Sequence, residues 1–176
     1  MDARARLAAD IDAAARLTGS FKLRSGQVSN EYFDKYRFEA DPALLARVAA
    51  AMLPLVPEEA EVLAGLELGG VPIATAMSLQ DGRPAAFVRK KAKDYGTCLA
   101  VEGGSMAGRK VVMIEDVITT GGAVRDAHRL LLEAGAIPVA VVCAIWRGEG
   151  SPAIQDLEIP IRAALCREDL IRATRR

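Results

Sequence analysis

The chain has 176 residues, 51% of them apolar, and 23 basic side chains balance 23 acidic ones, so its formal net charge is zero. This length suits a single domain spanning residues 1–176, and the apolar fraction excludes an intrinsically disordered protein. Balanced charge argues against nucleic acid as the main partner, because proteins that bind nucleic acid usually carry a positive excess.

The first forty residues combine a helix with short extended segments. Apolar residues at helical spacing predict a helix over Asp2–Leu17, and Gly19 ends it. The segment Phe21–Asp34 is typical of extended chain with a turn at Ser25–Gly26. Because this combination differs from the rest of the chain, we expect residues 1–40 to form a small flap over the main sheet.

The remainder of the chain alternates strands with helices. Asp41 followed by Pro42 is a typical helix start, and this helix should extend to about Leu55. Strands that alternate with helices and carry continuous β-branched runs predict an α/β fold, with a mostly parallel central sheet flanked by helices. The further predicted elements are the strand Glu61–Leu66, the helix Val71–Leu79, the strand Ala85–Arg89, a loop over Lys90–Gly104, the strand Lys110–Glu115, the helix Gly121–Ala134, the strands Pro138–Trp146 and Ile159–Leu165, and a tail helix over Arg167–Arg176.

The sequence offers little for metal or nucleophile chemistry. His128 is the single histidine, and Cys98, Cys143 and Cys166 lack metal-type spacing, which argues against zinc sites and Ser–His or Cys–His nucleophiles. An odd number of cysteines without a signal peptide predicts reduced thiols in a cytoplasmic protein. No apolar stretch approaches the ~18 residues of a membrane-spanning helix, so we expect no membrane partner.

The most informative segment is Val111–Ala123, in which a hydrophobic strand is followed by Glu115 and Asp116, two apolar residues, and Thr-Thr-Gly-Gly. In α/β sheets, ligands bind at the carboxyl ends of strands. The turn Thr119–Ala123 offers backbone N–H groups, hydroxyls and a helix N-terminus, which suit a phosphate monoester. The two carboxylates suit vicinal hydroxyls, so the segment predicts a ribose 5-phosphate site. The alternative is an acidic strand end before an ordinary helix cap.

Residues 112–123 resemble the signature of type I phosphoribosyltransferases, which bind phosphoribosyl pyrophosphate (PRPP). No Walker-type motif and no G-x-G-x-x-G motif competes with this interpretation. The resemblance implies the type I phosphoribosyltransferase fold. Within this segment it implies that PRPP is bound by Glu115, Asp116, Val117, Ile118, Thr119, Thr120, Gly121, Gly122 and Ala123.

A cationic run, Arg89–Gly96, opens the predicted loop and packs four cations into five positions. Such a run is often only a solvated surface, but cations near a phosphate site could stabilise a departing diphosphate. The run resembles the catalytic loop of orotate phosphoribosyltransferases. The resemblance implies a mobile catalytic loop over residues 89–104 that acts across a homodimer, and many relatives have histidine where Tyr95 stands. The residues it assigns to the diphosphate are Arg89, Lys90 and Lys93.

Two other segments resemble the parts of this family that bind orotate. Trp146–Glu149 matches one of them, and its Arg147 could hold the orotate carboxylate with a guanidinium fork. Its alternative role is that of a surface arginine at a strand end. Phe21–Asp34 matches the other, although its aromatic residues could equally be packed in a hairpin. The implied orotate-binding residues are Arg24, Tyr32, Phe33, Thr119 and Arg147.

The segment Glu67–Pro72 matches the family's diphosphate loop, and Gly69 and Gly70 are its implied PRPP-binding residues. Some relatives have a lysine where Gly69 stands. The missing cation implies that the diphosphate is held by backbone N–H groups and by the cationic run.

The resemblance implies a displacement at ribose C1, in which orotate N1 attacks PRPP to form orotidine 5'-monophosphate and diphosphate, in pyrimidine (UMP) biosynthesis. The implied cofactor is Mg²⁺, carried by PRPP and not bound directly by the protein. Two alternatives stay open: a phosphoribosyltransferase for purine bases, and a PRPP-sensing regulator without catalysis. The predicted catalytic residues are Arg89, Lys90, Lys93 and Asp116.

Overall fold

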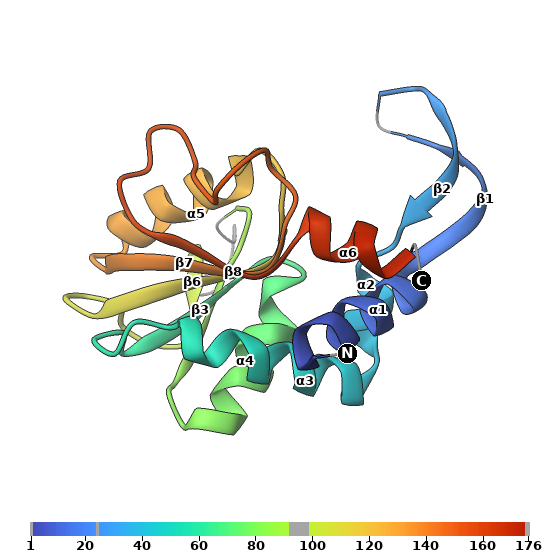
Figure 1. Ribbon diagram of the computed structural model, residues 1–176. Helices are drawn as coiled ribbons and strands as arrows, with labels where there is room; N and C mark the ends of the chain where they lie inside the picture. Colours follow the sequence, from blue (N-terminus) through green and yellow to red (C-terminus); the bar gives the residue numbers. More distant parts are fainter. Residues whose placement is uncertain (1, 24, 92–98, 175–176) are drawn as a thin grey trace.

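The computed structural model describes residues 2–23, 25–91 and 99–174, and six strands form its central sheet in the order β5-β4-β3-β6-β7-β8 (Figure 1). Neighbouring strands run parallel from β4 to β8, whereas β5 is antiparallel to β4. The predicted α/β fold with a mostly parallel sheet is therefore confirmed. The strands are β3 (Val62–Leu66), β4 (Ala85–Val88), β5 (Val101–Glu102), β6 (Lys110–Ile118), β7 (Ile137–Trp146) and β8 (Ile161–Cys166).

Helices cover both faces of this sheet, with α5 on one face and α3 and α4 on the other (Figure 1). Each face has its own apolar cluster, and the central strands contribute to both because alternate side chains point to opposite faces. Every residue of β3 is buried, as expected for a strand covered on both sides. The helices are α1 (Ala3–Ala15), α2 (Tyr36–Ala40), α3 (Pro42–Met52), α4 (Gly70–Asp81), α5 (Gly122–Glu133) and α6 (Arg167–Thr174), with a 3₁₀ turn over Leu53–Leu55.

Side-chain caps mark the starts of α1 and α3, of which the cap at Asp41 was predicted. Asp2 and Asp41 accept hydrogen bonds from Ala5 N and Leu44 N at 2.7 and 2.8 Å, which fixes the starts of α1 and α3. The prediction that the first helix reaches Leu17 was wrong, because β1 begins at Arg16. The short helix α2 was not predicted, and it has no side-chain cap that would have marked its start.

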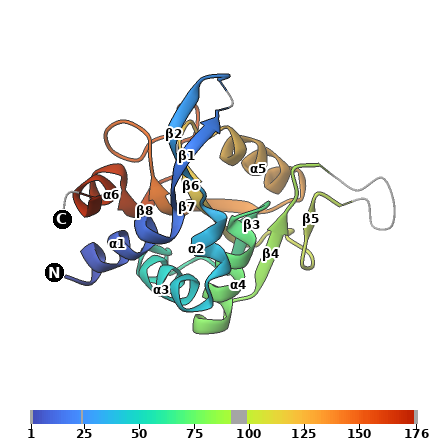
Figure 2. The same cartoon turned by 90° about the vertical axis from the view of Figure 1, so that its right-hand side faces the viewer.

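The segment after α1 folds into a two-stranded antiparallel hairpin, β1 (Arg16–Lys22) and β2 (Val28–Phe33). The predicted turn at Ser25–Gly26 lies between them, and Gly26 has a φ of +86°, which glycine adopts readily. Figures 1 and 2 both show the tip of this hairpin projecting from the body of the molecule.

The largest differences from the sequence prediction near the carboxyl edge of the sheet concern β6 and β5. The strand predicted to end at Glu115 continues to Ile118, because its pairing with β7 extends to Trp146. Strand β5 lies within the segment predicted as an uninterrupted loop, Lys90–Gly104. Within the described part of the chain, no helix is both long and apolar enough to cross a membrane.

Candidate active site

The predicted phosphate turn lies at the carboxyl edge of the sheet, between β6 and α5. Gly121 has a φ of +74°, and a Cβ at this position would come within 2.6 Å of the Ile154 side chain. Thr119 and Thr120 are exposed, and the N-terminus of α5 follows directly at Gly122. The turn therefore presents hydroxyls and unpaired helix N–H groups at one place, as a phosphate site requires.

The two acids lie inside β6 and are not exposed at its end. Asp116 has no exposed surface, and Glu115 is 6% exposed. Asp116 N donates a 3.0 Å hydrogen bond to Glu115 Oε1, and Val117 N donates to Asp116 Oδ1. Burial, together with the neighbouring Asp116, raises the pKa of Glu115 to about 9, so this side chain is a neutral acid near neutral pH.

Two residues that the sequence analysis missed complete the surroundings of Asp116. Lys35 Nζ lies 2.5 Å from Asp116 Oδ2 in an ion pair, and Glu39 is 7% exposed beside it. Burial and the hydrogen bond with Asp116 raise the pKa of Glu39 to about 9. Although burial alone would raise the pKa of Asp116, hydrogen bonds from Glu39, Glu115 and Lys35 hold it below its ordinary value. Asp116 is therefore the ionised carboxylate of this group.

Sequence alone gave a weak signal for this cluster. Lys35 and Glu39 lie four residues apart around α2, a spacing that places side chains on one helical face. The helix is too short to be predicted from periodicity, so the sequence alone could not indicate that Lys35 and Glu39 lie on one helical face.

The glycine loop between β3 and α4 packs directly on the acids. A Cβ on Gly69 would overlap Asp116 Oδ2, and a Cβ on Gly70 would overlap the Ile114 carbonyl. Both positions therefore require glycine, and the backbone comes close to any ligand of Asp116. The loop also meets the cationic segment, because Lys90 N donates a 2.8 Å hydrogen bond to Glu67 Oε2.

A cavity of about 530 Å³ joins the cationic segment to the phosphate turn. Arg89 and Lys90 line it together with Gly122 and Ala123, so the structure brings these predicted PRPP-binding residues together. Lys93 and Tyr95 lie outside the described residues. A separate apolar groove of about 460 Å³, between α1, α3 and β8, contains none of the predicted site residues.

Arg147 follows β7 and lies against the base of the hairpin. Its guanidinium carbon is 5.3 Å from the centre of the Phe33 ring. Burial, with the nearby charges of Arg167 and Arg16, lowers the pKa of Arg147, which indicates a cation without a carboxylate neighbour. The ring of Tyr32 instead stacks on Phe21, with the ring centres 5.5 Å apart. Arg24 lies outside the described residues.

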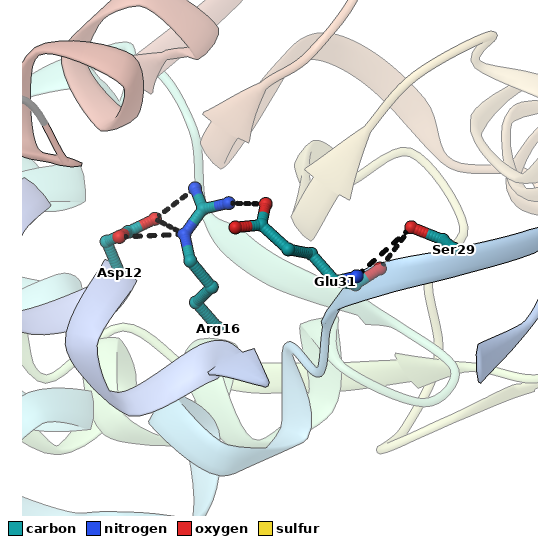
Figure 3. A network of polar contacts seen from close by, with 4 residues as sticks. All are labelled: Asp12, Arg16, Ser29 and Glu31. Carbon is teal, nitrogen blue, oxygen red and sulfur yellow. Dashed lines mark hydrogen bonds and ion pairs between the residues drawn. The ribbon is translucent and has the colours of Figure 1, made fainter. Parts of the chain in front are cut away.

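A polar network centred on Arg16 joins the hairpin to α1 (Figure 3). Arg16 forms ion pairs of 2.7 Å with both Asp12 of α1 and Glu31 of β2. Ser29 Oγ donates a 2.7 Å hydrogen bond to the Glu31 carbonyl. Arg16 is the cross-strand partner of Phe33, so this network also sets the position of the ring beneath Arg147.

Among the residues that the structure describes, no group of three or more His, Cys, Asp or Glu side chains is arranged to hold a metal ion. Asp116 is ion-paired with Lys35, and the buried carboxyls of Glu39 and Glu115 lie beside it. These acids suit hydroxyl groups better than a bare divalent cation.

Comparisons with known proteins agree with this arrangement. Residues 37–162 match the family model of the phosphoribosyl transferase domain. An orotate phosphoribosyltransferase of Nocardioides sp. is 60% identical over 167 residues, which cover 94% of this chain and 93% of the relative.

Solved structures of orotate phosphoribosyltransferases are also similar to this chain. The orotate phosphoribosyltransferase of Mycobacterium tuberculosis H37Rv in complex with Fe(III) dicitrate is similar with a TM-score of 0.84 and 31% identity, covering 95% of this chain and 98% of the other. The same enzyme in complex with PRPP has a TM-score of 0.80 at 29% identity, and these matches cover 95% of this chain and 98% of that one.

Proposed function

The chain belongs to the phosphoribosyltransferase family and, within it, to the orotate phosphoribosyltransferases. We propose how the residues of this chain carry out the reaction of orotate phosphoribosyltransferases. In this reaction the ribose 5-phosphate of PRPP is transferred to N1 of orotate, which yields orotidine 5'-monophosphate and diphosphate in pyrimidine biosynthesis. The observation that carries the assignment of roles is that the phosphate turn, the acids and the glycine loop meet at one sheet edge.

The 5-phosphate of PRPP is bound by the turn Thr119–Ala123. Its exposed threonine hydroxyls and the N-terminus of α5 supply donors and a favourable dipole. The ribose hydroxyls are bound by Glu115 and Asp116, since an ionised carboxylate beside a neutral one can accept and donate hydrogen bonds to vicinal hydroxyls.

Orotate lies between the phosphate turn and the hairpin base. Arg147 has no carboxylate neighbour of its own among the described residues, which supports a bidentate contact with the orotate carboxylate. The ring of Phe33 contacts the guanidinium of Arg147. Thr119 and Arg147 directly follow the paired strand ends Ile118 and Trp146, so they lie at the same edge of the sheet. The roles of Arg24 and Tyr32 remain predictions from the resemblance, and the stacking of Tyr32 on Phe21 makes a direct ring contact with orotate less favourable.

The diphosphate is bound by the N–H groups of Gly69 and Gly70, which lie against Asp116, and by Arg89 and Lys90. Arg89 and Lys90 line one cavity with Gly122 and Ala123 of the phosphate turn. Lys93 is assigned to the same group by the resemblance. The resemblance implies Mg²⁺ carried by PRPP, which would add positive charge at the diphosphate, and no side chain of this chain is assigned as its direct ligand.

Catalysis requires positioning and charge stabilisation, and no covalent intermediate with the protein. Orotate N1 attacks ribose C1 while the diphosphate departs, and the cations stabilise the charge that develops on it. The resemblance further supports a homodimer in which the loop 89–104 serves the partner's site. The free thiols of Cys143 and Cys166 support a reducing, cytoplasmic environment.

The test is the consumption of orotate, followed by its ultraviolet absorbance, with PRPP and Mg²⁺. Parallel reactions contain adenine, hypoxanthine or uracil. Loss of orotate that requires both PRPP and Mg²⁺, without reaction of the other bases, is the expected result. Tight PRPP binding without turnover would instead indicate a regulator, and turnover of a purine alone would contradict the role of Arg147.

A further inference from the structure

Lys35 covers the carboxylate that the proposed reaction needs. Its ammonium lies 2.5 Å from Asp116 Oδ2, and its side chain is 33% exposed whereas Asp116 has no exposed surface. The backbone of Gly69 packs against the same oxygen, because a Cβ on Gly69 would overlap it. Ribose hydroxyls can therefore reach Asp116 only if the ammonium of Lys35 gives up its place.

The glycine loop beside Lys35 has no cation of its own. A side chain at position 69 would overlap Asp116, so this position cannot supply one in the present arrangement. Lys35 and Gly69 contact the same carboxylate oxygen, which places the ammonium next to the loop that is proposed to hold the diphosphate.

We propose that Lys35 is a substrate-binding residue that exchanges partners, leaving Asp116 when the ribose hydroxyls arrive and then binding the diphosphate of PRPP. This inference rests on the proposed function and assigns to Lys35 the cation that position 69 lacks. It also explains why the side chain of Lys35 stays partly exposed although its ion-pair partner Asp116 is fully buried.

The groups around Lys35 are consistent with such an exchange. Glu39 and Glu115 face Asp116 as neutral acids, so the net charge of the cluster with Lys35 is close to zero. The ring of Tyr36 lies 5.3 Å from the ammonium and gives it a second, weak contact. Hydroxyls that replace the ammonium leave a free cation beside the glycine loop, where the substrate carries its largest negative charge.

The decisive experiment compares two ligands that differ only in the diphosphate. Binding of PRPP and of ribose 5-phosphate is measured by calorimetry for the unaltered chain, Lys35→Met and the control Lys110→Met. Lys110 is exposed at the opposite end of β6 and belongs to no part of the site. We expect Lys35→Met to weaken the binding of PRPP at least about tenfold, as the loss of one charged hydrogen bond does.

For ribose 5-phosphate we expect unchanged or tighter binding to Lys35→Met, because the ligand no longer has to displace an ammonium. A merely structural role would weaken both ligands together. Parallel losses, or unchanged PRPP binding, would overturn the proposal. Lys110→Met should match the unaltered chain with both ligands.

Should Lys35→Met fail to fold, lysine acetylation of the unaltered chain decides the question. Mass spectrometry measures the reactivity of Lys35 alone, with PRPP and with ribose 5-phosphate. We expect ribose 5-phosphate to raise the reactivity and PRPP to lower it. Equal effects of the two ligands would contradict the exchange.

The same preparations separate this inference from the proposed function. If the unaltered chain consumes no orotate with PRPP, the proposed function fails. If it consumes orotate while Lys35 shows no difference between the two ligands, only the exchange fails.

Discussion

The guanidinium of Arg147 lies over the ring of Phe33, with 5.3 Å between the guanidinium carbon and the ring centre. This contact joins the end of β7 to the base of the hairpin, two segments that are more than a hundred positions apart in the sequence. The ring holds the cation in place without neutralising it. Arg147 thus keeps its hydrogen-bond donors available for a ligand.

Replacing Arg147 by alanine should weaken the binding of orotate far more than the binding of PRPP. A hydrogen-bonded contact between charged groups contributes about 1.5–3 kcal/mol, so the KM for orotate should rise roughly 10- to 100-fold while the KM for PRPP changes little. Steady-state kinetics with each substrate varied in turn measures both values. Equal losses for the two substrates would exclude a role in base recognition.

Replacing Gly121 by alanine should destabilise the phosphate turn. Its φ of +74° and the nearby Ile154 side chain oppose a Cβ, which should cost about 1–3 kcal/mol of unfolding free energy and weaken PRPP. Gly122→Ala is the matched control, because no atom lies within 4 Å of its Cβ position. Urea denaturation of both variants measures the difference. Similar stabilities would mean that the turn tolerates side chains at both positions.

Replacing Lys93 by alanine should slow turnover with only a modest change in PRPP affinity. A cation that acts on the departing diphosphate stabilises the transition state more than the bound substrate, so kcat should fall about 100-fold. Lys93 lies outside the described residues, and the exposed Lys91 from the same cationic run provides the control variant. Single-turnover kinetics separates chemistry from product release. An unaltered turnover number would argue against a catalytic role.

The sequence predicted the fold and the phosphate turn because both depend on local patterns. Alternating strands and helices determine the α/β class, and the Thr-Thr-Gly-Gly turn carries its function in consecutive backbone groups. The end of β6 was missed because the pairing with β7, not local propensity, decides where that strand stops.

The surroundings of Asp116 could not be predicted because they depend on distant segments. Lys35 and Glu39 come from a helix of five residues, too short to give a periodic signal. Their contact with Asp116 arises only when α2 packs at the edge of β6. Likewise, Tyr32 and Phe33 are neighbours in the sequence but make different contacts, because adjacent strand residues point to opposite faces.

The raised pKa of Glu39 makes stability depend on pH in a defined direction. Its pKa is about 9 in the folded chain against 4.5 as the ordinary value. Between these values the folded state keeps a proton that the unfolded state releases. The contribution of Glu39 to stability is therefore fully present below about pH 4.5 and is lost as the pH rises toward 9. Glu115, also raised to about 9, adds to the same decrease.

Replacing Glu39 by glutamine should make this decrease shallower, because the amide keeps a donor for Asp116 but binds no proton. Each such group contributes about 1.4 kcal/mol per pH unit within its window, so the variant should lose one such contribution and retain that of Glu115. Urea denaturation of both chains from pH 5 to pH 9 measures the two slopes. Glu133→Gln, on the exposed side of α5, serves as control. Parallel pH profiles for Glu39→Gln and the unaltered chain would show that Glu39 is already ionised when folded, and Lys35 would then face two carboxylates instead of one.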